Sequence, residues 1–358
     1  MRKKGLEPPR REALEPKSSA STNSATLAQI YELLFFTSLP RAFYRKRPLL
    51  AHAAWLFCSP TASESACFAN IIRQLFINYF PSLSHVPVEH YENFPVASWL
   101  LPPHLRHPIE IIYAFARSAD DFADEGNLLI PERLALLDGY QRELDQIAAG
   151  AKSSGSLFAD LAQVIRQHDL PIQLFRDLLD AFAQDVTKTR YANFVELMDY
   201  CRRSANPIGR LLLHLNLMAT PQNLAWSDSI CSALQLINHW QDIAIDWKKN
   251  DGGRVYLPQD ELARYVISEQ DIATQTGSVA WQQLMAFQCD RARAMMRAGR
   301  PLGGIMTGRM GAELRLMMAG GMAILDKIDA VHGDVFRHRP QLTKWDWLLI
   351  APRALIFS

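Results

Sequence analysis

Two groups of aspartates, far apart in the chain, have the types and spacing needed for metal chemistry. Asp120 and Asp124 are four residues apart in a helical pattern, which places both carboxylates on one helix face. Asn238, Asp242 and Asp246 repeat this spacing later in the chain. A helix that buries several carboxylates must pair them with cations or give them to a metal. Because Mg²⁺ is commonly bound by one or two carboxylates and substrate phosphates, we expect the two groups to face each other and hold Mg²⁺ against a diphosphate.

Other polar residues share these helix faces. Tyr113 and Arg117 lie on the stripe of Asp120, with Asp121 beside it, and Gln235 lies on the second stripe. A single pair of acids at this spacing is most often a solvent-exposed face. Two pairs, each in an otherwise apolar helix and each accompanied by an amide or an arginine, favour a site. Neither group has His or Cys at ligand spacing, which disfavours zinc.

A third segment, residues 200–209, combines polar and small residues around a proline. Tyr200 and Ser204 share a helix face, and Pro207 should kink or end that helix. Ser204 and Gly209 are small enough to leave room for a ligand. Close packing between helices is the alternative, because small residues permit that as well.

The loop 248–258 directly follows the second aspartate group. It contains glycines, two lysines and Arg254. A mobile basic loop beside a metal–diphosphate site could close over it. An ordinary surface loop is the alternative.

Composition narrows the class of protein. The chain has 358 residues, of which 49% are apolar and 21% charged, as in ordinary globular proteins. The net charge of +1 gives no basis for a nucleic-acid partner, and we expect none. Five scattered cysteines without a CxxC pair favour a reducing, cytosolic setting. None of the ten histidines stands in a recognisable catalytic pattern, and we expect none to be catalytic.

Helical periodicity dominates the chain from about Pro87 onward, and strand-like alternation is scarce. The expected helices cover 104–125, 131–149, 157–168, 171–187, 194–203, 208–217, 228–247, 268–276, 278–299 and 311–331, and residues 345–355 form an apolar C-terminal piece. No run of about 18 apolar residues indicates a transmembrane helix. We therefore predict a single all-α domain over residues 86–358.

Residues 1–85 are expected to form an N-terminal extension. Residues 1–26 are polar and rich in Pro and Ser, which predicts disorder. A short amphipathic helix over Leu27–Leu39 and the basic cluster Arg41–Arg47 could lie on an anionic membrane surface at the cytoplasmic side. A loosely folded extension without that role is the alternative.

The motifs resemble those of the squalene/phytoene synthase family over residues 88–345. The segments that carry the resemblance are DDFAD at 120–124, NHWQDIAID at 238–246, YCRRSANPIG at 200–209 and GRVYLP at 253–258. The resemblance implies an all-helical class I isoprenoid synthase bundle with a central apolar cavity. It also implies Mg²⁺ as cofactor and an isoprenoid diphosphate as substrate.

The resemblance assigns roles by position. Metal ligands would be Asp120, Asp124, Asn238, Asp242 and Asp246, and the catalytic set would be the four aspartates with Arg117. Diphosphate contacts would come from Arg117, Tyr113, Asp121 and, more loosely, Arg254. The substrate channel would be lined by Tyr200, Ser204, Gly209 and Gln235.

Longer segments are similar to the branch of the family that makes hydroxysqualene in bacterial hopanoid biosynthesis. That branch implies conversion of presqualene diphosphate and water to hydroxysqualene and diphosphate, with product hand-off to other squalene-pathway enzymes. Residues 91–95 lack the Lys that condensing members carry, and Gln241 stands where many have Arg. Both departures remove positive charge expected for a second diphosphate. The alternatives are a condensing synthase (squalene, dehydrosqualene or phytoene) and a non-catalytic helical scaffold.

Overall fold

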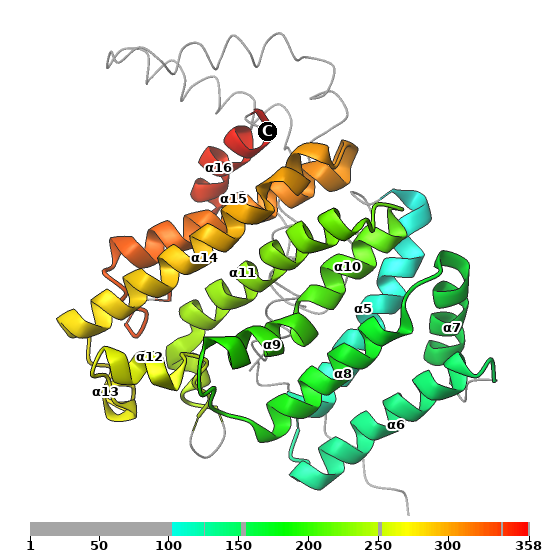
Figure 1. The fold of residues 1–358 in the computed structure, drawn as a ribbon, viewed down its shortest axis with the longest axis horizontal. Coiled ribbons are helices and arrows are strands. Elements are labelled where there is room, and N and C mark those ends of the chain that lie inside the picture. The colour runs from blue at the N-terminus through cyan, green and yellow to red at the C-terminus, as the bar shows by residue number, and fades with distance from the viewer. Residues whose placement is uncertain (1–101, 125, 152–154, 250–252, 338, 357–358) are drawn as a thin grey trace, which may run out of the picture.

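The helix α11 (Pro221–Asp246) runs through the centre of the molecule, as Figure 1 shows for this computed structural model. Every residue from Ile230 to Ile243 is buried. A helix that is buried on all sides must be covered by neighbours on all sides. The structure describes residues 102–124, 126–151, 155–249, 253–337 and 339–356. The expected N-terminal extension and its boundary at residues 85–86 lie outside these ranges.

Eleven further helices surround α11 in the described residues. They are α5 (Pro103–Asp124), α6 (Ile130–Ala148), α7 (Ser156–His168), α8 (Ile172–Thr187), α9 (Phe194–Ser204), α10 (Asn206–Leu215), α12 (Gln259–Arg264), α13 (Glu269–Ala273), α14 (Val279–Ile305), α15 (Gly308–Ala330) and α16 (Lys344–Ile356). The described ranges contain no strand, only an isolated bridge between Arg190 and Val255. None of the helices in these ranges has both the length and the apolar character needed to cross a membrane. The prediction of an all-α domain is confirmed.

The core has two parts, one on each side of the bundle. Helices α5 to α8 and most of α10 share one buried cluster that includes Phe115, Phe175 and Leu178. Helices α9, α11, α14 and α15 share the other, which includes Trp240 and Trp281. Figure 1 shows α14, α15 and α16 on one side of α11 and α5 to α8 on the other.

Three details of the helices differ from the sequence prediction. Helix α11 begins at Pro221, seven residues earlier than expected, because Thr220 caps it by accepting from the backbone N–H of Asn223 and proline fits the first helical turn. Helix α14 continues through Pro301 to Ile305. The short helix α12 was not predicted; six residues are too few to show a helical period.

The break at Pro207 occurs where the sequence predicts it. Helix α9 ends at Ser204 and α10 begins at Asn206, so Pro207 occupies the first turn of the new helix. This break places Tyr200 and Ser204 on α9 and Gly209 on α10.

Gly209 allows α10 to lie very close to α11. A Cβ atom at this position would stand 2.3 Å from Oγ of Ser227 and 2.5 Å from Sγ of Cys231. Both are far below an ordinary contact distance, so any side chain here must displace the Ser227 and Cys231 side chains or move the helix that carries them. Close packing, which the sequence left open, is therefore one role of this glycine.

We expect Gly209→Ala to lower the free energy of unfolding by about 1–3 kcal/mol, because it overpacks the α10–α11 contact. The measurement is thermal or urea denaturation. Gly139→Ala in α6 is the matched control, since its new methyl group meets only Nη2 of Arg142 at 3.7 Å. Equal effects of the two substitutions would show that the close approach at Gly209 has no energetic weight.

Candidate functional site

The first aspartate group lies at the C-terminal end of α5. Asp120 is 2% exposed, and Arg117 lies beside it, with Nη1 3.8 Å from Oδ2 of Asp120. The same guanidinium reaches Oδ1 of the more exposed Asp121 at 2.8 Å. Arg117 is therefore held at the first group by the acids of its own helix.

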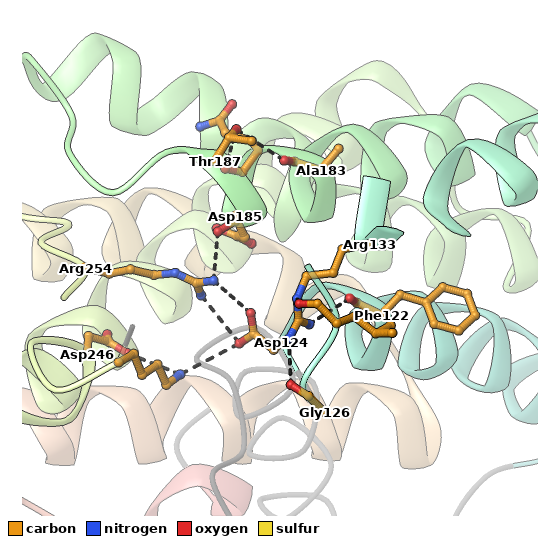
Figure 2. Close-up of polar contacts among 12 residues, drawn as sticks. Phe122, Asp124, Gly126, Arg133, Ala183, Asp185, Thr187, Asp246 and Arg254 are labelled. Carbon is orange, nitrogen blue, oxygen red and sulfur yellow. Dashed lines mark hydrogen bonds and ion pairs between the residues drawn. The ribbon is translucent and has the colours of Figure 1, made fainter. Parts of the chain in front are cut away.

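The end of α5 is fixed by an arginine from the next helix. Arg133 donates to the carbonyl oxygens of Phe122 at 2.9 Å and Gly126 at 2.8 Å. The last carbonyls of a helix have no partner within it, and this side chain satisfies that of Phe122 while also binding Gly126 beyond the helix end. Asp124, in the final turn, is thereby positioned (Figure 2).

The second group lies in the last turns of α11. Asn238, Asp242 and Asp246 are all buried, at 6%, 4% and 1% exposure. The helix around Asn238 and Asp242 is buried as well, and Asp246 stays buried although the adjacent Ile245 is 45% exposed, so these polar groups belong to the interior of the molecule and not to a solvated face. The burial excludes the exposed acidic surface that such spacing most often marks.

The two groups meet through cations from the segment that follows α11. Nζ of Lys249 lies 3.9 Å from Oδ2 of Asp124 and 3.4 Å from Oδ1 of Asp246. Nη2 of Arg254 donates to Oδ1 of Asp124 at 2.8 Å, and the backbone N–H of Arg254 donates to the carbonyl of Asp246 at 2.8 Å. Figure 2 shows Arg254 directed at Asp124, with Asp246 nearby. The carboxylates of Asp124 and Asp246, the last acids of α5 and α11, thus share Lys249, whereas the Arg254 guanidinium contacts only Asp124 of the two.

Arg254 is almost fully buried, at 4% exposure. Burial alone would lower the pKa of its guanidinium, but Tyr256, Asp185 and Asp124 outweigh burial and raise it. Nη2 also donates to the backbone carbonyl of Asp185 at 2.8 Å. Arg254 therefore remains a fixed cation at the first group, and residues 253–258 do not form the exposed loop that the sequence left as an alternative.

A buried network of aromatic and acidic side chains lies behind Arg254. The hydroxyl of Tyr200 donates to Oδ2 of Asp185 at 2.9 Å, and the hydroxyl of Tyr256 lies 3.5 Å from Oδ1. Burial raises the pKa of Asp185 to about 7, although the charge of Arg254 opposes the shift. His239 stacks on Tyr256 with ring centroids 3.6 Å apart. Burial, with Lys249 and Arg254 nearby, lowers the pKa of His239 to about 3, so its imidazole is neutral.

The second group has its own cation, from the segment between α15 and α16. Arg339 contacts Asp242 through two atoms, Nε to Oδ1 and Nη2 to Oδ2, the latter at 3.3 Å. Nε2 of Gln241 donates to the carbonyl of the adjacent Pro340 at 2.6 Å. The sequence predicts the loss of a cation at Gln241, where many family members have Arg. Arg339 places a cation at the neighbouring Asp242, so this part of the site keeps positive charge. Residues 91–95, the other departure, lie outside the described ranges.

The remaining predicted residues are placed as follows. Gln235 is buried on α11, with Nε2 3.3 Å from Nε2 of His239. Ser204 is buried on α9, near the helix break. Tyr113 is half-buried on α5 and packs against the core of the α5 side. Of the four residues expected to line the substrate channel, Gly209 lines the apolar cavity described next, whereas Tyr200, Ser204 and Gln235 do not.

An apolar cavity lies toward the other end of the same helices. It is lined by Ile109 of α5, by α10 around Gly209, by the first half of α11, and by Leu302 to Met317 of α14 and α15. Ile109 precedes Asp120 by three helical turns, and Cys231 precedes Asp242 by the same distance along α11. The bundle thus has acids and cations at one end and an apolar cavity at the other.

One carboxyl group stands in this apolar lining. Glu313 is 4% exposed, and its carboxyl oxygens accept no hydrogen bond from the described residues. Burial raises its pKa to about 7, with the charge of Arg309 acting in the opposite direction. Glu313 therefore keeps its proton to a higher pH than an exposed glutamate does.

The donors in the two aspartate groups suit Mg²⁺. All are carboxylate or amide oxygens, which hard cations prefer, and none is nitrogen or sulfur. Among the described residues no three acids lie close enough to bind one ion by themselves. Mg²⁺ usually takes only one or two protein carboxylates and completes its shell with phosphate and water. The residues therefore fit an ion that arrives with a diphosphate, which Asp120 and Asp124 would hold on one side and Asn238, Asp242 and Asp246 on the other.

Sequence reasoning missed Asp185, Arg339 and Glu313. Asp185 could have been found, because it continues the apolar face of Leu178 and Phe182 on α8. Glu313 similarly interrupts the apolar pattern of α15. Arg339 lies between helices, where no periodicity points to a partner.

Comparison with known proteins identifies a family and several similar proteins. The family model of squalene/phytoene synthase matches residues 88–346. Hydroxysqualene synthase of Rhodopseudomonas palustris is 36% identical over 229 residues, 64% of this chain and 76% of that protein. Hydroxysqualene synthase of Sinorhizobium fredii is 33% identical over 262 residues, 72% of this chain and 86% of that protein. The 15-cis-phytoene synthase of Synechococcus elongatus is 30% identical over 287 residues, 76% of this chain and 90% of that protein.

Solved structures agree with these matches. Squalene synthase HpnC from Alicyclobacillus acidocaldarius superposes with a TM-score of 0.62 at 34% identity, covering 74% of this chain and 93% of that one. A dehydrosqualene synthase has a TM-score of 0.61 at 19% identity, covering 72% and 88%, and shows the shared fold alone. The prediction of a class I isoprenoid synthase bundle is confirmed.

We expect Glu313→Gln to stabilise the protein more at about pH 8 than at about pH 5. Between the ordinary pKa of glutamate and about 7, the unfolded chain is ionised while the folded carboxyl keeps its proton, so stability is lost as the pH rises through this range. The glutamine removes that loss, which is about 3 kcal/mol or less. Thermal unfolding of both proteins across this pH range is the measurement. A difference that does not change with pH would show that Glu313 ionises normally in the fold.

Proposed function

Because the chain belongs to the squalene/phytoene synthase family, whose members act on isoprenoid diphosphates, we propose that it converts presqualene diphosphate and water to hydroxysqualene and diphosphate with Mg²⁺. The observation that carries the proposal is the division of the bundle. Buried acids and their cations lie at one end, and an apolar cavity lies toward the other end of the same helices. This division matches a substrate with a charged head and long hydrocarbon chains.

The cations have a direct use in this reaction. Mg²⁺ would act as a Lewis acid and as a template for the leaving diphosphate. Arg117, Lys249 and Arg254 are held by acids of the site and lie where the diphosphate would be bound. As the C–O bond to the diphosphate breaks, negative charge grows on the leaving group, and fixed cations stabilise it without having to move.

The apolar cavity has the complementary use. A carbocation formed by loss of diphosphate must rearrange before water reaches it. Walls of Ile, Leu and Met exclude bulk water from that step. One water molecule then forms a bond to the allylic cation and loses a proton, which gives the alcohol. Asp185, which Tyr200 and Tyr256 hold in a buried polar network, would provide an acceptor for this proton near the charged end.

Two relatives named hydroxysqualene synthase, at 36% and 33% identity, support this product. Head-to-head condensation of farnesyl or geranylgeranyl diphosphate is the second candidate. It is favoured by the similarity to 15-cis-phytoene synthase and by Arg339, which adds a cation at Asp242 where a second diphosphate would need one. The third candidate, a helical scaffold without activity, does not explain why acids and cations are buried next to each other at one end of the bundle.

The deciding experiment is product analysis with the purified full chain and Mg²⁺. We expect presqualene diphosphate to give hydroxysqualene, with release of one diphosphate per turnover. Turnover of farnesyl or geranylgeranyl diphosphate alone would overturn the proposal in favour of condensation. Folded protein that is inert toward all three substrates would favour the scaffold.

We also expect Asp120→Asn and Asp242→Asn each to lower kcat by about 10³-fold or more, because each removes charge that holds the metal–diphosphate complex. Asp290→Asn is the matched control, since Asp290 is an 80% exposed aspartate on α14. Circular dichroism should show intact folds, and titration calorimetry should show weaker binding of Mg²⁺–diphosphate to the two site variants. Unchanged turnover in both would refute the assignment of the aspartate groups.

A further inference from the structure

The chain that follows Arg254 is fixed by the segment between α8 and α9. The backbone N–H of Val255 donates to the carbonyl oxygen of Thr189 at 3.0 Å. Four residues later, the backbone N–H of Gln259 donates to the carbonyl oxygen of Tyr191 at 2.9 Å. The course of the chain on this side of Arg254 is therefore set by backbone hydrogen bonds.

The chain that precedes Arg254 passes very close to the end of α11. Gly253 has φ of 64°, and a Cβ atom there would stand 2.2 Å from the carbonyl oxygen of Trp247. Glycine is the residue that adopts this conformation at this distance without strain. Gly253 is buried, so its own carbonyl group needs a hydrogen-bond partner in place of water.

Arg190 is that partner. Its Nη1 donates to the carbonyl oxygen of Gly253 at 2.8 Å. Its Nη2 donates to Oε2 of Glu269 at 2.8 Å, and its Nε donates to the other oxygen of the same carboxylate. The guanidinium also lies over the ring of Trp247, 5.7 Å from the ring centroid. One side chain thus joins the residue before Arg254 to the end of α11 and to α13.

Glu269 keeps the guanidinium of Arg190 in one orientation. Two parallel N–H bonds to a carboxylate fix the plane of an arginine, which a lysine cannot reproduce. The hydrogen bond from Arg190 lowers the pKa of Glu269, so the carboxylate stays charged at neutral pH. Glu269 is itself placed by α13, which Ser268 caps by accepting from the backbone N–H of Asp271.

We propose that Arg190, through the Gly253 carbonyl, positions Arg254 for the leaving diphosphate. The carbonyl of Gly253 and the N–H of Arg254 belong to one peptide group. Arg190 holds this group at the carbonyl, and the carbonyl of Asp246, 2.8 Å from the N–H, holds it at the other side. The orientation of the group sets the direction from which the Arg254 side chain reaches Asp124 (Figure 2). The inference rests on the proposed function, which assigns Arg254 to the diphosphate.

A positioning role predicts a particular kinetic change. A cation stabilises the leaving group without reorganisation only while it is held in place, so loosening it costs rate more than substrate affinity. We expect Arg190→Gln to lower kcat about 10- to 100-fold, with a change in KM of about threefold or less. Affinity for Mg²⁺–pyrophosphate, which resembles the leaving group, should fall about tenfold.

The test is a double-mutant cycle of Arg190→Gln and Arg254→Gln in the purified full chain. The measurements are kcat with presqualene diphosphate and Mg²⁺, and binding of Mg²⁺–pyrophosphate by titration calorimetry. Arg254→Gln alone should lower kcat about 100-fold or more. If Arg190 acts through Arg254, adding Arg190→Gln to that variant should lower kcat by about twofold or less, whereas independent effects would multiply.

Arg210→Gln is the matched control. Arg210 also donates through Nε and Nη2 to both oxygens of one carboxylate, that of Asp228, and is 36% exposed against 26% for Arg190. Asp228 precedes Asp242 on α11 by about four turns, so this pair is remote from the aspartate groups. The control should lose about as much thermal stability as Arg190→Gln and keep its kcat and its pyrophosphate affinity.

Glu269→Gln tests the same arrangement if Arg190→Gln does not fold. It leaves Arg190 in place but weakens its two-bond partner, and the side chain of Glu269 is 40% exposed. We expect kcat to fall about threefold, and this loss should disappear when Arg254 is already glutamine.

Two results would overturn the inference. One is the same loss of kcat and pyrophosphate affinity from Arg190→Gln whether or not Arg254 is present, and the other is an equal loss from Arg210→Gln. Pyrophosphate binding needs no turnover. A protein that is inert toward presqualene diphosphate but shows the coupling in pyrophosphate binding would refute the proposed function alone. An active protein with independent effects would refute only this inference, and a wild type that does not bind Mg²⁺–pyrophosphate would refute both.

Discussion

The rest of the structure depends on the burial of acids and cations at one end of a helical bundle. Asp120, Asp242 and Asp246 are each less than 5% exposed, and so is Arg254. An isolated charge in such a place would be very costly, so each group is kept only because opposite charges are arranged around it. The segments after α11 and α15 supply Arg254 and Arg339, and the ion pairs of these arginines with Asp124 and Asp242 hold the two segments in place.

The fold was largely predictable because long helices repeat their pattern many times. The periodicity of α5, α8 and α11 is visible over four or more turns, and the spacing of Asp120 with Asp124 and of Asn238 with Asp242 and Asp246 follows from it. Helix ends were harder to predict. The start of α11 at Pro221 depends on a cap by Thr220, and the six residues of α12 are too few to show a helical periodicity.

The contacts between distant segments were beyond the reach of sequence reasoning. Arg254 was expected to meet a diphosphate, yet its partner in the structure is Asp124, and nothing local in 253–258 indicates that choice. Arg339 restores the charge that Gln241 seemed to remove, because a segment beyond α15 passes the end of α11. A charge argument that counts only neighbours in sequence cannot include such a residue. Tyr200 likewise serves Asp185 in a buried network and does not line the apolar cavity.

The contact of Arg254 with Asp124 has a consequence for how the protein is made. The two residues are 130 positions apart in the chain, and joining them closes a loop of that length, which costs chain entropy. During synthesis, a chain that has reached the end of α11 already contains both aspartate groups. It still lacks Arg254, which contacts Asp124, and Arg339, which contacts Asp242. Both ion pairs can therefore be present only after the chain beyond α15 has been made.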